Sequence, residues 1–328
     1  METTMTRNIL RRGALGALLA SSLATGAAHA EYPDHPVTVV VAFAPGGMTD
    51  IVSRLLSAEL GKRFNQTFVV ENKPGAAGQV GTELVARQKN DGYTLLVSAT
   101  GHVIGPAVNA KVRYDPVKDF EPISILARAP NLLVVNSGLP VQTIPEFLSW
   151  GKSQPGVPYG SAGFGGSTHL GGEWLKKITG VPMEHVPYKG ASPATNAVVS
   201  GELKVAVQDA MSVAPFIKSG QLRPIGVASA ERSKLFPDLP TFAESGAPGL
   251  DVYTWLGFYA PAGTDPAIVA KLNAATNEIM NSPEMVQRLA GQNSEPLGPM
   301  TPKQVADFVA GETAKWRNVV QTTGVKVE

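Results

Sequence analysis

A strand, a glycine turn and a helix follow one another in residues 37–60, VTVVVAFAPGGMTDIVSRLLSAEL, and this unit constrains the fold most. Residues 37–43 are an apolar run typical of a buried strand, and residues 44–49 form a loop. Thr49 or Asp50 is the expected N-cap of the following helix. The first turn of a helix has unpaired N–H groups and the positive end of the dipole, so this unit predicts a site for a carboxylate or phosphate.

The loop does not have the sequence of a nucleotide-binding loop. The lysine and hydroxyl of G-x-x-x-x-G-K-[ST] are absent, and PGGMTD does not fit G-x-G-x-x-G. A Pro-Gly-Gly that only closes a tight turn is the alternative interpretation. Similar loops at residues 98–102, 162–166 and 189–192 favour a binding role, because each follows a predicted strand.

The rest of the chain repeats short strands and helices. Further strands are expected at residues 67–71, 93–98, 123–135 (broken near Pro130), 157–161, 184–188, 203–208, 222–229 and 251–259. Helices are expected at residues 80–88, 145–152 and 213–219, at a segment capped by Ser167 or Thr168, after residue 192, and after the pairs Thr264 with Pro266, Ser282 with Pro283 and Thr301 with Pro302. This order predicts an α/β protein whose ligand lies beyond the carboxyl ends of the strands.

Residues 1–30 have the pattern of an export signal. Arg7, Arg11 and Arg12 precede an apolar run at residues 14–24, and Ala-His-Ala predicts cleavage after Ala30. The arginine pair leaves a twin-arginine route open, although its flanking residues fit that pattern poorly. The apolar run is too short to span a bilayer, so we expect a periplasmic protein without stable membrane insertion of the mature chain. The remaining chain is too long for one compact core, which predicts two lobes.

Composition excludes several classes of function. The net charge of the full sequence is +1 and the signal segment is basic, so the mature chain is nearly neutral. Near-neutral charge argues against nucleic acid or an anionic membrane as a partner. Cysteine is absent, which excludes a thiol nucleophile, disulfides and a thiolate metal site. We expect no cofactor and no metal.

Eight segments carry a family resemblance. In chain order they are VVAFAPGGMTD, VENKPGAAGQVG, DGYTLLVSATGH, YDPVKDFEPIS, PYGSAGFGGSTHLGGEWL, VPYKGASPA, FPDLPTFAESG and FYAPAGTD. They resemble the Bug-type (TctC-like) substrate-binding receptors of tripartite tricarboxylate transporters. The resemblance implies a two-lobed, hinged periplasmic binding protein of type II, a Venus flytrap, in which each lobe is a mostly parallel sheet flanked by helices. One lobe would comprise residues 31–126 plus 230–328, and the other residues 127–229.

The resemblance also implies a solute-binding site between the lobes. From the first lobe, the site would use Phe43, Gly46, Gly47, Met48, Thr49, Asp50, Ser98, Thr100 and His102. From the second lobe, it would use Ser161, Gly165, Gly166, Ser167, Thr168, His169, Tyr188, Ala191 and Asp209. Met48 stands where many relatives have a small residue, so the identity of the solute cannot be inferred from that of a relative.

Two anion-binding loops in opposite lobes suit a small organic acid, either a dicarboxylate or an aromatic carboxylate. Closure of the lobes would bring both loops within reach of one solute. The receptor would then deliver the acid to membrane permease subunits. A ligand sensor for a membrane signalling kinase is the alternative, and the sequence does not separate the two.

An enzyme is the competing class. The segment GGSTH has His169 where the G-x-S-x-G nucleophile motif requires glycine, and the sequence places no base beside Ser161 or Ser167. Hydrolysis is therefore disfavoured. His169 and Glu173 are spaced i, i+4 and could supply two ligands to a metal ion, but the sequence indicates no third ligand.

Two acidic residues have open roles. Asp50 is equally suited to cap a helix and to contact the solute. Asp209 either orders neighbouring loop amides or accepts from an amino or hydroxyl group on the solute.

Overall fold

The computed structural model describes residues 31–324, so the predicted signal peptide at residues 1–30 lies outside the described residues. Contacts divide the chain into two units, Met1–Asp34 and His35–Glu328. The description that follows concerns the second unit.

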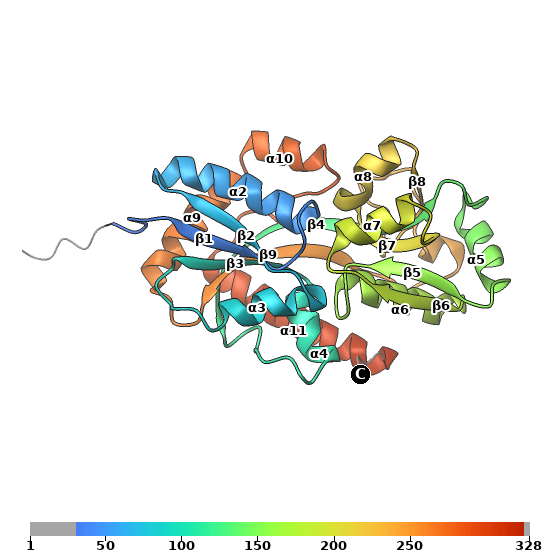
Figure 1. Ribbon diagram of the computed structural model, residues 1–328, viewed down its shortest axis with the longest axis horizontal. Coiled ribbons are helices and arrows are strands. Elements are labelled where there is room, and N and C mark those ends of the chain that lie inside the picture. The colour runs from blue at the N-terminus through green and yellow to red at the C-terminus, as the bar shows by residue number, and fades with distance from the viewer. Residues whose placement is uncertain (1–30, 325–328) are drawn as a thin grey trace, which may run out of the picture. The chain divides into compact units, whose positions relative to one another are not determined.

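The described part of this unit is an α/β fold built on connected strands (Figure 1). In chain order the strands are β1 (Val37–Val41), β2 (Phe68–Asn72), β3 (Thr94–Ala99), β4 (Phe120–Asn136), β5 (Val157–Ser161), β6 (Met183–Pro187), β7 (Val205–Asp209), β8 (Leu222–Val227) and β9 (Tyr253–Pro261). Their order in space is β2-β1-β3-β9-β4-β7-β5-β6, with β8 beside β4.

The first lobe contains β1, β2, β3, β9 and the beginning of β4. Strand β1 pairs in parallel with β2 and β3, whereas β9 is antiparallel to β3 and β4. The sequence of β1, VTVVV, is apolar on both faces and almost entirely buried, as expected for a strand covered by helices on both sides. Helices α2 (Met48–Phe64) and α10 (Pro283–Ala290) lie on one side in Figure 1, and α3 (Gln79–Val85) and α4 (Gly101–Val108) on the other.

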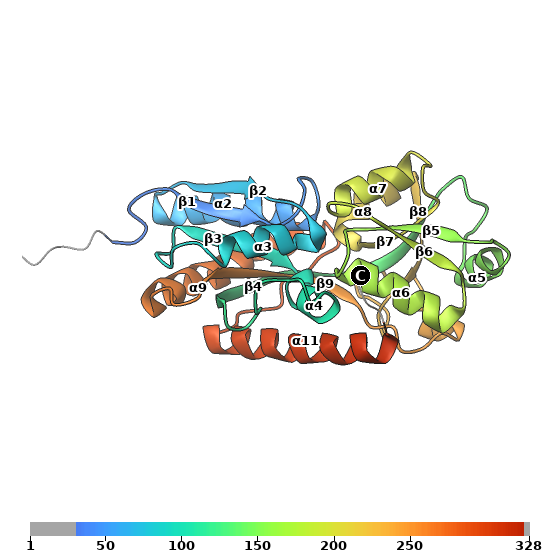
Figure 2. The same cartoon turned by 60° about the horizontal axis from the view of Figure 1, so that its bottom comes forward.

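Two long C-terminal helices complete this lobe. Helix α9 (Pro266–Met280) packs against α2 and β4, and α11 (Pro302–Thr323) packs against α4 and β4. Figure 2 shows α11 running along the side of the molecule that carries α4.

The second lobe contains the end of β4 with β5, β6, β7 and β8. Strand β5 is parallel to β6 and β7, and β4 is antiparallel to β7 and β8. Helix α6 (Ser167–Thr179) covers one face, α7 (Ala191–Val199) and α8 (Ala210–Lys218) cover the other, and α5 (Ile144–Lys152) lies against β8. The two-lobed α/β class predicted from the sequence is confirmed, with a mixed sheet in each lobe where a mostly parallel one was expected. The residues at which each lobe begins and ends stay a prediction.

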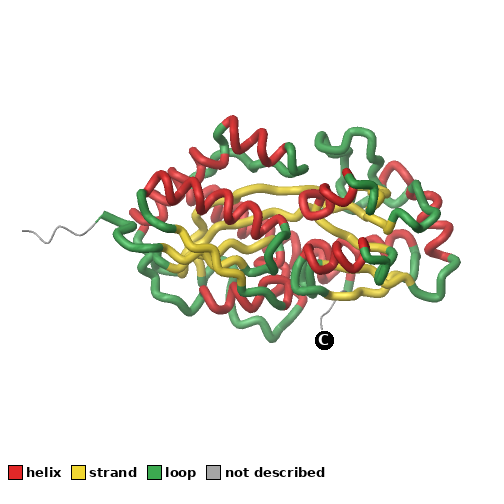
Figure 3. The backbone as a smooth tube through the Cα atoms, turned by 45° about the horizontal axis from the view of Figure 1, so that its top comes forward, coloured by secondary structure: helices red, strands yellow, loops and turns green. Residues whose placement is uncertain are grey.

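Strand β4 belongs to both lobes. Residues 120–130 pair with β9, and residues 131–136 pair with β7 and β8. Figure 3 shows strands, in yellow, continuing from one lobe into the other. The predicted break near Pro130 is wrong, because β4 runs through this residue. Pro130 is tolerated because it stands where the partner changes, so its missing N–H interrupts no continuous ladder.

Several helix starts were predicted correctly. Ser282 and Thr301 are the N-caps of α10 and α11, and the helix expected at residues 145–152 is α5, with Thr143 as its N-cap. Each of the three hydroxyl oxygens accepts a backbone N–H. Thr301 and Gln304 also form the reciprocal contacts of a capping box. The N-cap of α9 is Asp265, one residue after the Thr264 that marked this helix in the sequence.

The predicted starts of α2 and α6 are wrong. Gly47 is the N-cap of α2, ahead of Thr49 and Asp50, and Gly166 is the N-cap of α6, ahead of Ser167 and Thr168. The hydroxyl and carboxylate side chains that normally cap a helix bond to other groups here. Neither N-cap residue therefore has a side chain that accepts from the first turn of its helix, although the Met48 N–H at the start of α2 donates to Ser212 Oγ of the second lobe.

Helix α4 was missed, since residues 98–102 were expected to form a loop. Its sequence, GHVIGPAV, has two glycines and a proline and so has low helix propensity. Packing against α11 and α3 outweighs that propensity. His102 is consequently buried inside the first lobe.

Candidate functional site

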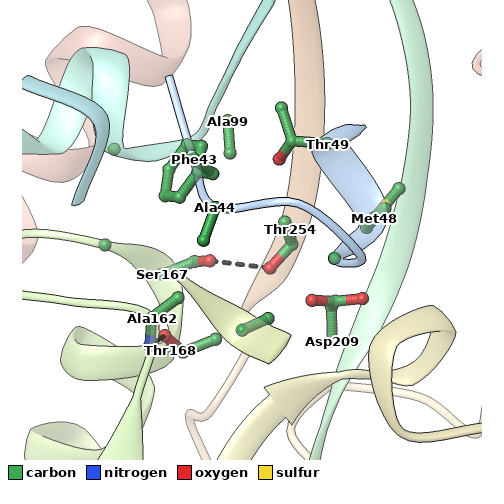
Figure 4. Close-up of a pocket in the computed structure, with 14 residues that line it drawn as sticks. Phe43, Ala44, Met48, Thr49, Ala99, Ala162, Ser167, Thr168, Asp209 and Thr254 are labelled. Carbon is green, nitrogen blue, oxygen red and sulfur yellow. Dashed lines mark hydrogen bonds between the residues drawn. The ribbon is translucent and has the colours of Figure 1, made fainter. Parts of the chain in front are cut away.

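Several helices begin at the wall of one cavity. For three of them, α2, α6 and α7, the N-caps are Gly47, Gly166 and Gly190, which have no side chain to cap the helix, although the Met48 N–H of α2 donates to Ser212 Oγ. The lining residues, shown in Figure 4, are Phe43, Ala44, Gly47, Met48, Thr49, Ala99, Gly101, Ala162, Gly166, Ser167, Thr168, Ala191, Asp209 and Thr254. Uncapped N–H groups and positive helix ends thus lie near the same small space, which favours an anion there.

Asp50 holds the loop before α2. Its carboxylate accepts from the Gly46 N–H at 3.0 Å, from Asn72 Nδ2 at 2.9 Å and from Arg54 Nε at 3.0 Å. Burial raises the pKa of Asp50, but these hydrogen bonds outweigh burial, so the pKa lies below its ordinary value. Gly46 has φ of +85°, a conformation that favours glycine. The loop shape therefore depends on Asp50, which does not itself line the cavity.

The loop before α6 is held in the same way. Thr168 Oγ1 accepts from the Ala162 N–H at 3.0 Å, and His169 Nδ1 accepts from the Gly165 N–H at 3.2 Å. Because these side chains reach back to the loop, the first N–H groups of α6 stay free of side-chain caps. Burial lowers the pKa of His169 to about 4, which keeps the ring neutral and able to accept at neutral pH.

Hydrogen bonds join the two lobes around the cavity. Thr254 of β9 donates its hydroxyl to Asn131 Oδ1 at 2.7 Å, so the Ser167 hydroxyl donates to Thr254 across 2.8 Å (Figure 4). The Met48 N–H donates to Ser212 Oγ at 3.2 Å. The lobes are therefore in contact on more than one side of the site.

The cavity between these contacts is small. Its volume is about 30 Å³, far below the roughly 300 to 1,000 Å³ of typical ligand pockets. An organic acid of several carbons needs more space, so the loops must separate to admit one.

Nine of the residues implied by the resemblance line this cavity: Phe43, Gly47, Met48, Thr49, Gly166, Ser167, Thr168, Ala191 and Asp209. They come from both lobes, although they are far apart in the sequence. The remaining implied residues do not line it and have other contacts, as follows.

Gly46, Asp50, Gly165 and His169 hold the two loops from behind, through the contacts described above. Tyr188 donates its hydroxyl to Glu202 at 3.0 Å, away from the cavity.

Ser98, Thr100 and His102 are buried in the first lobe. The Ser98 hydroxyl lies 3.4 Å from Thr82 Oγ1, and Thr100 Oγ1 accepts from the Trp255 N–H at 2.9 Å. His102 stacks on Tyr259, with ring centroids 4.4 Å apart. Burial lowers the pKa of His102 to about 4, so the ring is a neutral packing group.

Ser161 has a histidine beside it that the sequence did not place there. The Ser161 hydroxyl contacts His185 Nε2, and His169 stacks on the His185 ring with centroids 3.9 Å apart. This pair is not suited to nucleophilic catalysis. Burial lowers the pKa of His185 to about 3, Ser161 is fully buried outside the cavity, and no described residue holds His185 Nδ1.

Five lining residues were not predicted: Ala44, Ala99, Gly101, Ala162 and Thr254. Ala44 and Ala162 stand inside the two predicted loops, so loop membership alone could have found them. Thr254 had a weaker signal, since it is a polar residue in the mostly apolar and aromatic strand expected at residues 251–259.

Residues 31–324 contain no group of three side chains from His, Asp or Glu placed to hold a metal ion. Within the same range, no helix has the length and apolar character needed to cross a membrane.

Comparisons with known proteins identify similar receptors and similar solved structures. Residues 52–325 match the profile described as "Tripartite tricarboxylate transporter family receptor". The chain is 34% identical over 300 residues to protein BugT of Bordetella pertussis, covering 90% of this chain and 92% of BugT. This confirms the resemblance seen in the sequence.

Two solved structures from Rhodopseudomonas palustris are also similar. One is Rpa4515 with adipate, with a TM-score of 0.86 and 34% identity, covering 90% of this chain and 99% of that one. The other is MatC with bound malate, with a TM-score of 0.84 and 35% identity, covering 88% of this chain and 100% of that one.

Proposed function

Because this chain belongs to the receptor family of the tripartite tricarboxylate transporters, we propose that it captures an organic acid, a dicarboxylate or an aromatic carboxylate, between its two lobes. The protein is a solute-binding receptor and not an enzyme.

The observation that carries this proposal is the set of uncapped helix ends around one cavity. A helix N-terminus stabilises an anion by about 0.3 to 1 kcal/mol at an exposed site. Each hydrogen bond to a charged group adds about 1.5 to 3 kcal/mol. Because α2 belongs to one lobe while α6 and α7 belong to the other, an acid held by both favours contact between the lobes.

The similar structures support an acid as solute. Rpa4515 was solved with adipate and MatC with malate, and both ligands are dicarboxylic acids. The cavity of this chain is too small for either molecule in the present arrangement. Binding therefore requires an opening of the lobes, followed by closure on the solute.

A thermal-shift screen of carboxylic acids tests the proposal. The panel contains C4 to C8 dicarboxylates, aromatic acids and, as a control, neutral sugars. A bound acid at about 100 times its dissociation constant adds about 2.7 kcal/mol to the free energy of unfolding, so its melting temperature rises. The proposal fails if neutral sugars shift the transition and no organic acid does.

We further propose that the loaded receptor works in the periplasm and delivers its solute to membrane permease subunits. Membership of the transporter-receptor family supports both statements. Uptake of the radiolabelled acid by cells or vesicles that carry the permease should depend on added receptor. Uptake that is unchanged without the receptor would contradict delivery.

A further inference from the structure

The wall of the cavity has an unexpected charge for an acid-binding site. Among the fourteen described residues that line it, Asp209 is the one with an ionisable side chain. No lysine, arginine or histidine belongs to this set of described residues. An acid in the cavity must therefore rely on helix ends and hydroxyl groups, and it meets a carboxylate.

The carboxylate of Asp209 is held firmly but is not saturated. Oδ1 accepts from the Ser212 N–H at 2.9 Å, and Oδ2 accepts from the Ser212 hydroxyl at 2.8 Å. A carboxylate has about four acceptor positions, so these two contacts do not fill it. Figure 4 shows this carboxylate directed toward the loop that carries Met48, at the edge of the cavity.

Burial makes this arrangement selective. Asp209 is 3% exposed and has no cationic partner among the hydrogen bonds of the described residues. Burial raises the pKa of Asp209, so a second carboxylate placed against it would either be repelled or have to share a proton with it. A hydroxyl or ammonium group placed there would donate to a free acceptor position.

We propose that Asp209 is a specificity-determining residue that makes the receptor prefer acids with a hydroxyl or amino substituent close to a carboxylate. This inference rests on the proposed function, since the helix ends bind the carboxylate and Asp209 then reads the neighbouring substituent. An unsubstituted acid of the same length leaves the free acceptor positions of Asp209 without a donor.

A purely structural role makes a different prediction. Asp209 is also the N-cap of α8. If it only shaped the site, its substitution would weaken all acids by the same factor. The ratio between the affinities of substituted and unsubstituted acids separates the two roles.

The test compares three acids with one carbon skeleton: succinate, 2-hydroxysuccinate and 2-aminosuccinate. A longer set, adipate and 2-hydroxyadipate, is used if the C4 skeleton does not bind. Isothermal titration calorimetry measures the dissociation constants for the natural protein and for Asp209→Asn. Asp238→Asn is the matched control, because it makes the same change at an exposed position outside the cavity.

In the natural protein and in the control, we expect at least one substituted acid to bind about ten- to a hundredfold more tightly than the unsubstituted one. In Asp209→Asn, that preference should fall to within about threefold. The comparison in the natural protein needs no variant, so the inference can be tested even if Asp209→Asn does not fold.

The outcomes separate the two proposals. If unsubstituted acids bind the natural protein as tightly as substituted ones, or if the preference survives in Asp209→Asn, the inference about Asp209 is overturned and acid binding stands. If none of these acids nor any other organic acid binds, the proposed function itself fails.

Discussion

Removing the Ser212 hydroxyl should weaken the contact between the lobes. Ser212 Oγ donates to Asp209 Oδ2, which leaves its lone pairs to accept the Met48 N–H at 3.2 Å. Ser212 is buried and lies on α8 of the second lobe, while Met48 begins α2 of the first. Ser212→Ala keeps the backbone cap of α8, because Asp209 Oδ1 accepts from the backbone N–H of residue 212.

Two groups lose a partner, the Met48 N–H and Asp209 Oδ2, and the magnitude is worked from the Met48 N–H, which bridges the lobes. In the closed arrangement the Met48 N–H would stay buried without an acceptor, which costs about 1 to 3 kcal/mol. In an open arrangement water reaches this N–H, so the cost applies to the closed state alone. The closed state is thus disfavoured by about five- to 150-fold, and the dissociation constant of the solute rises by up to the same factor.

Two measurements check this prediction. Calorimetry gives the affinity for the acid found in the thermal-shift screen, and small-angle scattering gives the radius of gyration with and without that acid. Ser219→Ala is the control, because it removes an exposed hydroxyl at the other end of α8. Equal affinity and equal scattering for the two variants would refute the reasoning.

Three further results are expected. Thr168→Ala removes the acceptor of the Ala162 N–H beside the cavity, so calorimetry should show binding about tenfold weaker with a cooperative melt retained; unchanged affinity would contradict this. Gly172→Ala places a Cβ 2.2 Å from the Tyr159 ring, so urea unfolding should show a free energy of unfolding lower by about 1 to 3 kcal/mol or more. In the control Gly311→Ala, no atom lies within 4 Å of the new Cβ, so α11 should not be destabilised. Burial lowers the pKa of His169 from 6.5 to about 4, so between these two pH values the unfolded chain binds a proton that the folded chain does not. The free energy of unfolding should therefore fall by about 3 kcal/mol between pH 6.5 and 4 because of this residue. Urea unfolding of His169→Gln should lack this part of the pH dependence.

The sequence predicted the two-lobed class and the two glycine loops, because apolar runs and glycine turns are local signals. It misplaced the starts of α2 and α6 for a specific reason. Asp50 and Thr168 have the chemistry of helix caps, but their partners are Arg54 and the Ala162 N–H. Whether such a side chain caps its helix or bonds to another group depends on residues elsewhere in the fold, and a local sequence pattern does not contain that information.

The site was predicted in part for a similar reason. Residues on the two loops line the cavity because each loop directly connects the end of a strand to the start of a helix. Ser98 lies within β3 and His102 on α4, so both side chains are buried in the core of the first lobe. Thr254 reaches the cavity from β9, and strand alternation alone does not tell which face meets the other lobe.

The single strand β4, shared by both sheets, has a consequence for stability. A segment of 17 residues that is paired at one end to β9 and at the other to β7 and β8 cannot lose its structure in one half without exposing the other. The protein should therefore melt as one cooperative unit, and residues 127–229 expressed alone should not form a stable fragment. Amide protons of β4 on both sides of Pro130 should be among the slowest of the chain to exchange with deuterium.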